Sequence, residues 1–147
     1  MTEKTRGIPE GHHAVTPYLI IKGAADAITF YKKAFGAAEM MRVTDESGKV
    51  RHAEIKIGDS RVMLVDEFPE HPIMQSPVSL GGTAVHIFLY VEDADTLFAQ
   101  AIDAGAEELM PVEDHVEGDR RGGVTDPFGH IWWIATRIRD VPLEDIQ

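Results

Sequence analysis

The sequence repeats itself at one constant spacing. Gly36 falls on Gly105 at this spacing (105 − 36 = 69), and the residues around the two glycines also match. A strand-like segment and a turn followed by an apolar run recur at the same spacing. The matched pairs are 34–41 with 103–110, 18–21 with 87–90, and 58–65 with 127–134. One spacing that relates a strand, a helix end and a turn indicates a tandem duplication, so we expect two similar modules.

Composition limits what two such modules can do. The chain has 147 residues, of which 44% are apolar, which suits one domain built from two small modules. The net charge of 14 − 25 = −11 argues against nucleic acid and anionic membranes as partners. It is compatible with cationic or neutral partners, or simply with a solvated acidic surface. The absence of cysteine excludes disulfides, thiolate catalysis and cysteine-bound zinc. No apolar run approaches the roughly 18 residues of a membrane span, so we expect a cytoplasmic protein.

The order of elements in each module is expected to be β-α-β-β-β. Amphipathic spacing predicts a helix from Ala24 to Phe35 that ends at Gly36, and a second helix that is capped by Asp93 and ends at Gly105. Module one is expected at about 14–66, a linker rich in proline and glycine at 67–82, module two at about 83–137 and a polar tail at 138–147. Strands are expected at 14–21, 37–44, 50–57, 61–65, 84–91 and 106–111, with 122–125 leading into the last turn and strand.

Strand alternation divides the side chains between two faces. Ile55 and Ile57 are expected to pack under a helix, which leaves His52, Glu54 and Lys56 on the opposite face. In the strand of module two the two sets are Ile87, Leu89 and Val91 against His86, Phe88 and Tyr90. The sheet therefore has an apolar face covered by helices and a second face of polar and aromatic groups. A concave face of that kind can hold a small ligand.

These modules resemble a known superfamily. Phe30-Tyr31, Phe35-Gly36-Ala37 and Asp126-Pro127-Phe128-Gly129-His130 are similar to motifs of the vicinal oxygen chelate superfamily, which includes glyoxalase I, fosfomycin and bleomycin resistance proteins and extradiol dioxygenases. His52-Ala53-Glu54 and Tyr90-Val91-Glu92-Asp93 look like its PhnB-like branch, and the resemblance covers about 7–140. It implies an α+β fold in which two tandem βαβββ modules form curved mixed sheets around a concave ligand cup, with helices on the convex face.

The resemblance also implies where a metal would bind. In metal-dependent members each module supplies one ligand from its first strand and one from its fourth. These positions fall on His86 and Trp133 in module two. The repeat spacing carries them onto Pro17 (or Thr16 after a slip of one residue) and Leu64 in module one. Only His86 is a good ligand, which is too few for a divalent ion, so we expect neither a metal nor another cofactor. A displaced metal site built from His86, His52 and Glu54 is the alternative.

The remaining candidates carry less chemistry. His12, His13, His71 and His115 lie in expected loops and are taken as surface groups, and Asp126 is taken to serve the last turn. The sequence contains no nucleophile elbow, phosphate-binding glycine loop or Rossmann fingerprint.

Two functions follow from these observations. The first is a metal-free homodimer whose cup binds an aromatic or cationic compound, such as a bleomycin-type antibiotic. The second is an enzyme of the glyoxalase (lyase) or dioxygenase type, with His86 and Glu54 as catalytic residues or with a displaced metal site. A cup filled by its own side chains is a third possibility. The residues expected to contact the ligand are His52, Glu54, Leu64, His86, Phe88, Tyr90, Arg121 and Trp133.

Overall fold

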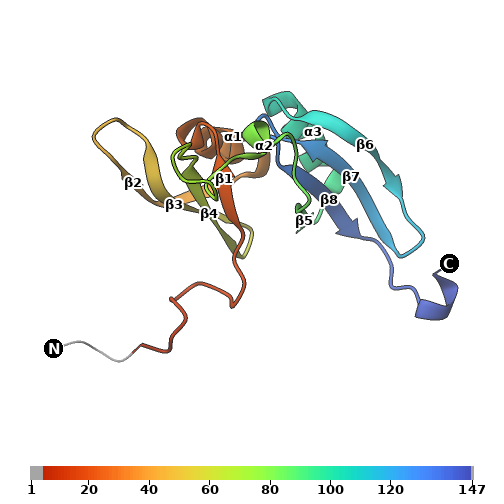
Figure 1. Cartoon of the computed structure of the whole chain (residues 1–147). Coiled ribbons are helices and arrows are strands. Elements are labelled where there is room, and N and C mark those ends of the chain that lie inside the picture. The colour runs from red at the N-terminus through yellow and green to blue at the C-terminus, as the bar shows by residue number, and fades with distance from the viewer. Residues whose placement is uncertain (1–4, 147) are drawn as a thin grey trace.

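The computed structural model describes residues 5–146 and confirms the predicted fold class. It contains two four-stranded sheets, one from each half of the chain, and each half has the order β-α-β-β-β (Figure 1). We call them sheet A and sheet B. The elements of the first half are β1 (Tyr18–Ile21), α1 (Ala24–Phe35), β2 (Ala38–Thr44), β3 (Val50–Ile57) and β4 (Ser60–Asp66). Those of the second half are β5 (His86–Tyr90), α3 (Ala94–Ala104), β6 (Glu107–Asp114), β7 (Asp119–Thr125) and β8 (Ile131–Arg137).

Both sheets are mixed and have the same topology. The order in sheet A is β1-β4-β3-β2, and that in sheet B is β5-β8-β7-β6. The first strand pairs in parallel with the fourth, and the other pairs are antiparallel. As a result β1 and β5 each have one edge that pairs with no strand of the described chain.

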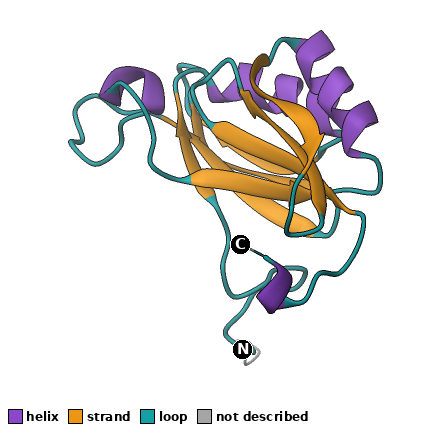
Figure 2. Cartoon of the chain, turned by 90° about the vertical axis from the view of Figure 1, so that its right-hand side faces the viewer, coloured by secondary structure: helices purple, strands orange, loops and turns teal. Residues whose placement is uncertain are grey.

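The helices cover one face of the sheets and leave the other open. Figure 2 shows α1 and α3 together on one side of the strands. Each helix begins and ends as predicted: the Asp93 side chain accepts a hydrogen bond from the amide of Thr96, and Gly36 and Gly105 close the two helices. We call the side without helices the outer face. None of the helices in residues 5–146 is long and apolar enough to cross a membrane.

A buried carboxylate joins the two modules. Asp126, in the turn before β8, accepts hydrogen bonds from the Tyr31 hydroxyl at 2.5 Å and the Trp132 indole nitrogen at 2.9 Å. Its other oxygen accepts from the amides of Phe128 and His130. Tyr31 and Trp132 are buried, and their rings lie 5.3 Å apart. The last turn of the chain is therefore fixed against the first helix.

The repeat spacing of the first and fourth strands differs by one residue from that of the helix ends. Leu19 pairs with Leu64 in sheet A, and Leu89 pairs with Ile134 in sheet B; all four side chains face the helices. The spacing of the first and fourth strands is thus 70 (89 − 19 and 134 − 64), whereas Gly36 and Gly105 remain 69 apart. Two differences in length account for this. The helix α3 is one residue shorter than α1, so β3 and β7 repeat at 69 like the helix ends (122 − 53 = 69). The turn before β8 is one residue longer than the turn before β4, which returns the spacing to 70. A shift of one residue moves every side chain of a strand to the other face.

Three segments differ from the sequence expectation. The linker contains a short helix, α2 (Pro77–Leu80), whose cap is the Ser76 side chain. The charged segment near residue 119 already belongs to β7, because Asp119 pairs with Arg137 of β8. The tail contains a single 3-10 turn, η1 (Leu143–Asp145).

Candidate functional site

The outer face of sheet B carries an exposed aromatic surface. His86, Phe88 and Tyr90 alternate along β5, and Trp133 lies beside Phe88 on β8. Phe88 is 46% exposed and Tyr90 is 54% exposed, and their rings lie 5.1 Å apart. We call these four residues the aromatic surface. Four rings side by side on two paired strands offer flat faces to a planar or cationic ligand.

The Trp133 ring spans the sheet from β7 to β5. Its indole nitrogen donates a hydrogen bond to Nδ1 of His86 at 3.0 Å. The opposite edge of the ring lies over Gly123 of β7, where an added Cβ would come within 2.8 Å of Trp133 Cζ3. Gly123 therefore leaves the room that this ring position needs. The pair Gly122-Gly123 inside a strand is the sequence signal that could have identified it.

Charged groups flank the aromatic surface. The Tyr90 hydroxyl donates to Asp119 at 2.7 Å, and Arg137 forms an ion pair with the same carboxylate at 3.2 Å. The hydrogen bond to Asp119, followed by desolvation, raises the pKa of Tyr90, so its hydroxyl remains a neutral donor around neutral pH. Arg121 is paired with Glu117. Arg121, which the sequence predicted to contact the ligand, is thus already neutralised by a carboxylate.

The outer face of sheet A carries a different cluster. Glu54 accepts a hydrogen bond from Arg61 at 3.2 Å and shares a hydrogen bond of 3.2 Å with Nε2 of His12. Nε2 of His52 lies 3.8 Å from the other carboxylate oxygen. The surface role expected for His12 is wrong, because its side chain is only 7% exposed and holds the N-terminal arm against Glu54. Gly11 packs on the Arg61 guanidinium, where no larger residue would fit without movement.

Leu64 does not belong to the site. It is fully buried under the helices and corresponds to Ile134, because the spacing between β4 and β8 is 70 and not 69. Met63 is the module-one position that corresponds to Trp133 (133 − 70 = 63), and Thr16 corresponds to His86 (86 − 70 = 16). Sequence reasoning placed Leu64 on the wrong face for this reason.

The residues present do not fit the metal site of metal-dependent relatives. With the corrected spacing the four positions are Thr16, Met63, His86 and Trp133, of which only His86 is a good ligand for a divalent ion. A metal-binding histidine usually donates its second ring N–H to an acceptor, whereas Nδ1 of His86 faces the Trp133 N–H donor. Within one chain the displaced site is not assembled either. His86 lies on sheet B and the other two residues on sheet A, and the described residues contain no group of three or more metal-ligating side chains.

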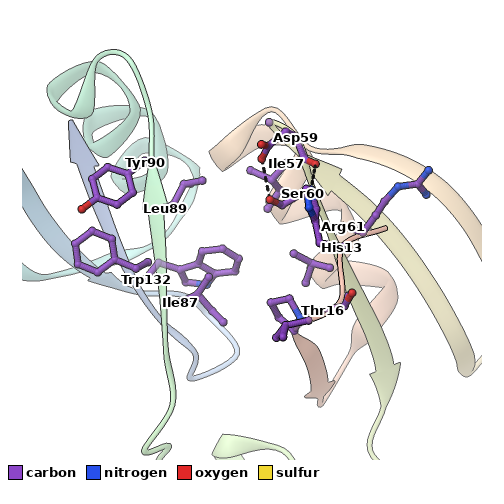
Figure 3. Close-up of a pocket in the computed structure, with 15 residues that line it drawn as sticks. His13, Thr16, Ile57, Asp59, Ser60, Arg61, Ile87, Leu89, Tyr90 and Trp132 are labelled. Atoms are coloured by element: carbon purple, nitrogen blue, oxygen red, sulfur yellow. Dashed lines mark hydrogen bonds between the residues drawn. The ribbon is translucent and has the colours of Figure 1, made fainter. Parts of the chain in front are cut away.

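A cavity lies between the two modules, and Phe88 and Tyr90 of the aromatic surface contribute to its lining (Figure 3). Its volume is about 580 Å³. One wall comes from β5 and Trp132, and the other comes from the arm before β1 and the turn between β3 and β4. The apolar lining includes Ile57, Val62, Ile87 and Leu89; the polar lining includes His13, Asp59, Ser60 and Arg61. His52, Glu54, His86 and Trp133 are not part of the lining.

This fold, with its open outer faces, defines a small α+β protein of paired βαβββ modules. Residues 11–134 match the family model of the Glyoxalase/Bleomycin resistance protein/Dioxygenase superfamily. The chain belongs to this superfamily. It is 45% identical over 136 residues to an uncharacterised protein of Mycobacterium tuberculosis, covering 91% of this chain and 80% of that protein.

Two solved structures show the same likeness. A gene product of Arabidopsis thaliana superposes with a TM-score of 0.68 and 33% identity, covering 84% of this chain and 98% of that one. TioX from Micromonospora sp. ML1 superposes with a TM-score of 0.66 and 25% identity, covering 88% and 100%. These similarities agree with the fold derived above from the residues.

Proposed function

We propose that the protein is a small-molecule binding protein that takes an aromatic or cationic compound on the aromatic surface without a metal. The observation that carries this proposal is the grouping of four rings on two neighbouring strands of an open face, three of them on exposed residues of β5. Large apolar side chains that are exposed together mark interaction sites in soluble proteins. We place the protein, as a further part of this proposal, in the PhnB-like branch and in the cytoplasm.

Charge favours a cationic ligand. The chain carries a net charge of −11. Glu117 and Asp119 near the aromatic surface are paired with Arg121 and Arg137, so the attraction comes from the charge of the whole chain. An acidic surface attracts cations, and an aromatic ring attracts a cation placed over its face. A bleomycin-type antibiotic combines planar heteroaromatic rings with a cationic group, so it is a suitable probe.

Replacing Trp133 by alanine tests this proposal. Loss of the indole face is expected to weaken binding of metal-free bleomycin by about 2- to 30-fold, which corresponds to roughly 0.5–2 kcal/mol. Isothermal titration calorimetry measures the change, and circular dichroism checks that the fold is kept. Ile73→Ala is a suitable control because Ile73 is 87% exposed and lies in the linker. Equal affinity of Trp133→Ala and the wild type would show that the aromatic surface is not the binding site.

An enzyme of glyoxalase or dioxygenase type is the second candidate, with His86 as the acid-base group and Glu54 or His52 as its partner. Within one chain these partners lie on the other sheet, and Trp133 occupies Nδ1 of His86. The observations within one chain therefore favour binding over acid-base catalysis.

We also propose that the protein is a homodimer. The arm before β1 and the strand β5 border the cavity between the modules, β1 and β5 each have an unpaired edge, and Val15 and Val85 are 86% and 70% exposed. Unpaired strand edges and exposed apolar side chains are features that partner chains cover. A second copy would cover these edges and could bring the outer face of sheet A next to that of sheet B, which would unite the predicted ligand residues.

Sedimentation equilibrium tests the dimer. The wild type is expected at twice the mass of one chain, which is 16.3 kDa. Val15→Asp is expected to shift the population toward the mass of one chain, because it places a charge in the interface. Ile73→Asp, at a position of nearly equal exposure in the linker, should leave the mass unchanged. A wild type that keeps the mass of one chain at all concentrations would exclude the dimer.

A further inference from the structure

We propose that Trp133 fixes His86 as a hydrogen-bond donor, so that the aromatic surface selects planar ligands that carry an acceptor oxygen. This inference rests on the proposed binding function and specifies its ligand class. The acceptor can be the carbonyl oxygen of a ketone or an amide.

The argument begins with the two ring nitrogens of His86. The indole nitrogen of Trp133 can only donate, and it lies 3.0 Å from Nδ1 of His86. Nδ1 must therefore carry a lone pair in this contact. In the neutral ring the proton then resides on Nε2, which makes no hydrogen bond within residues 5–146. His86 thus presents an unused N–H donor at the edge of an exposed aromatic surface.

The second step concerns how firmly Trp133 is held. The six-membered edge of the indole packs against the backbone of Gly123 on β7, while the five-membered edge reaches His86 on β5, the strand that flanks β8 on its other edge. The indole ring is thus held between the backbone of Gly123 and the lone pair on Nδ1 of His86. Gly123 acts as a positioning residue, because a methyl group there would push the ring and its N–H away from His86.

The third step defines the ligand. A planar compound that stacks on Trp133 or Phe88 places its substituents at the edge where His86 lies, since the two rings of His86 and Trp133 are 6.1 Å apart. An acceptor oxygen at that edge pairs with the Nε2 proton. A ligand with a hydrocarbon group there leaves the donor without a partner and loses the hydrogen bond.

Two matched compounds test the ligand class. The probe 2-acetylnaphthalene has a carbonyl oxygen where 2-isopropenylnaphthalene has a methylene of similar shape. The wild type is expected to bind the ketone about tenfold more tightly, as one neutral hydrogen bond provides. Trp133→Phe keeps a ring for stacking but removes the N–H, and Gly123→Ala displaces the indole. In both variants we expect the tenfold preference to fall toward parity while the hydrocarbon probe still binds.

Nuclear magnetic resonance provides a readout independent of the ligand. In protein labelled with nitrogen-15, a coupling across the hydrogen bond should connect the Trp133 indole nitrogen with Nδ1 of His86, and the imidazole proton should appear on Nε2. A proton on Nδ1 would overturn the inference. Equal binding of both probes by the wild type would also overturn it while leaving the proposed aromatic site intact. Failure of both probes to bind up to their solubility limits would count against the proposed function and this inference together.

Discussion

Replacing Asp126 by alanine is expected to lower the free energy of unfolding by about 4 kcal/mol, measured by urea denaturation. The carboxylate accepts four hydrogen bonds, from the Tyr31 hydroxyl, the Trp132 indole and the amides of Phe128 and His130. Asp126 is 3% exposed. Its removal leaves several buried donors without an acceptor, and each such donor costs about 1–3 kcal/mol, partly relieved by water that enters the gap.

The same loss should loosen the contact between the modules, because Asp126 joins the turn before β8 to α1. Asp93→Ala is the matched control. Asp93 also accepts a hydrogen bond from a backbone amide, but it lies at the exposed start of α3, so its loss should have a much smaller effect. If both variants were equally stable, the buried position of Asp126 would have no special role.

The second large effect is a loss of folding stability at alkaline pH, where the buried Tyr31 hydroxyl is expected to oppose deprotonation. Burial, followed by the charge of Asp126, raises the pKa of Tyr31 well above its ordinary value of 10.0. The folded protein therefore keeps the hydroxyl proton at a pH where the unfolded chain has released it. The contribution of Tyr31 is fully present below pH 10.0 and is lost as the pH rises through the folded-state pKa. Within that window this one group lowers the free energy of unfolding by about 1.4 kcal/mol per pH unit.

Comparison with Tyr31→Phe isolates this contribution. The variant is expected to be less stable than the wild type at neutral pH, because Asp126 loses one donor. Its stability should then fall less steeply above pH 10. Urea denaturation at several pH values between about 8 and 11 measures both slopes, and other tyrosines and lysines contribute equally to the two proteins. Parallel slopes for the two proteins would show that Tyr31 is not buried as a neutral group.

Much of the fold could be predicted from local patterns. The helix ends at Gly36 and Gly105 and the cap at Asp93 were correct, because each depends on backbone geometry within a few residues. The faces of β3 and β5 were also correct, since alternation in a half-buried strand needs only a period of two. The short helix in the linker was missed because four residues give no periodic signal.

The site was less predictable than the fold, partly because the repeat spacing used for its strands was wrong by one residue. The repeat spacing was taken from segments that include the helix ends, and the turn before β8 is one residue longer than the turn before β4. Leu64 was consequently assigned to the outer face, where Met63 lies instead. His12 was missed for another reason: its partner Glu54 is 42 residues away, and no local pattern reports such a contact.

The sequence by itself determined the two modules, their order of elements and the polar and aromatic character of one face, because repeats, turn residues and alternation are local properties of the chain. Only the tertiary structure decided which residues meet across strands and modules. The contact of Trp133 with His86 and Gly123, and that of Asp126 with Tyr31, join residues up to 95 positions apart. Such contacts depend on register and on the lengths of helices and turns, where a difference of one residue exchanges the two faces of a strand.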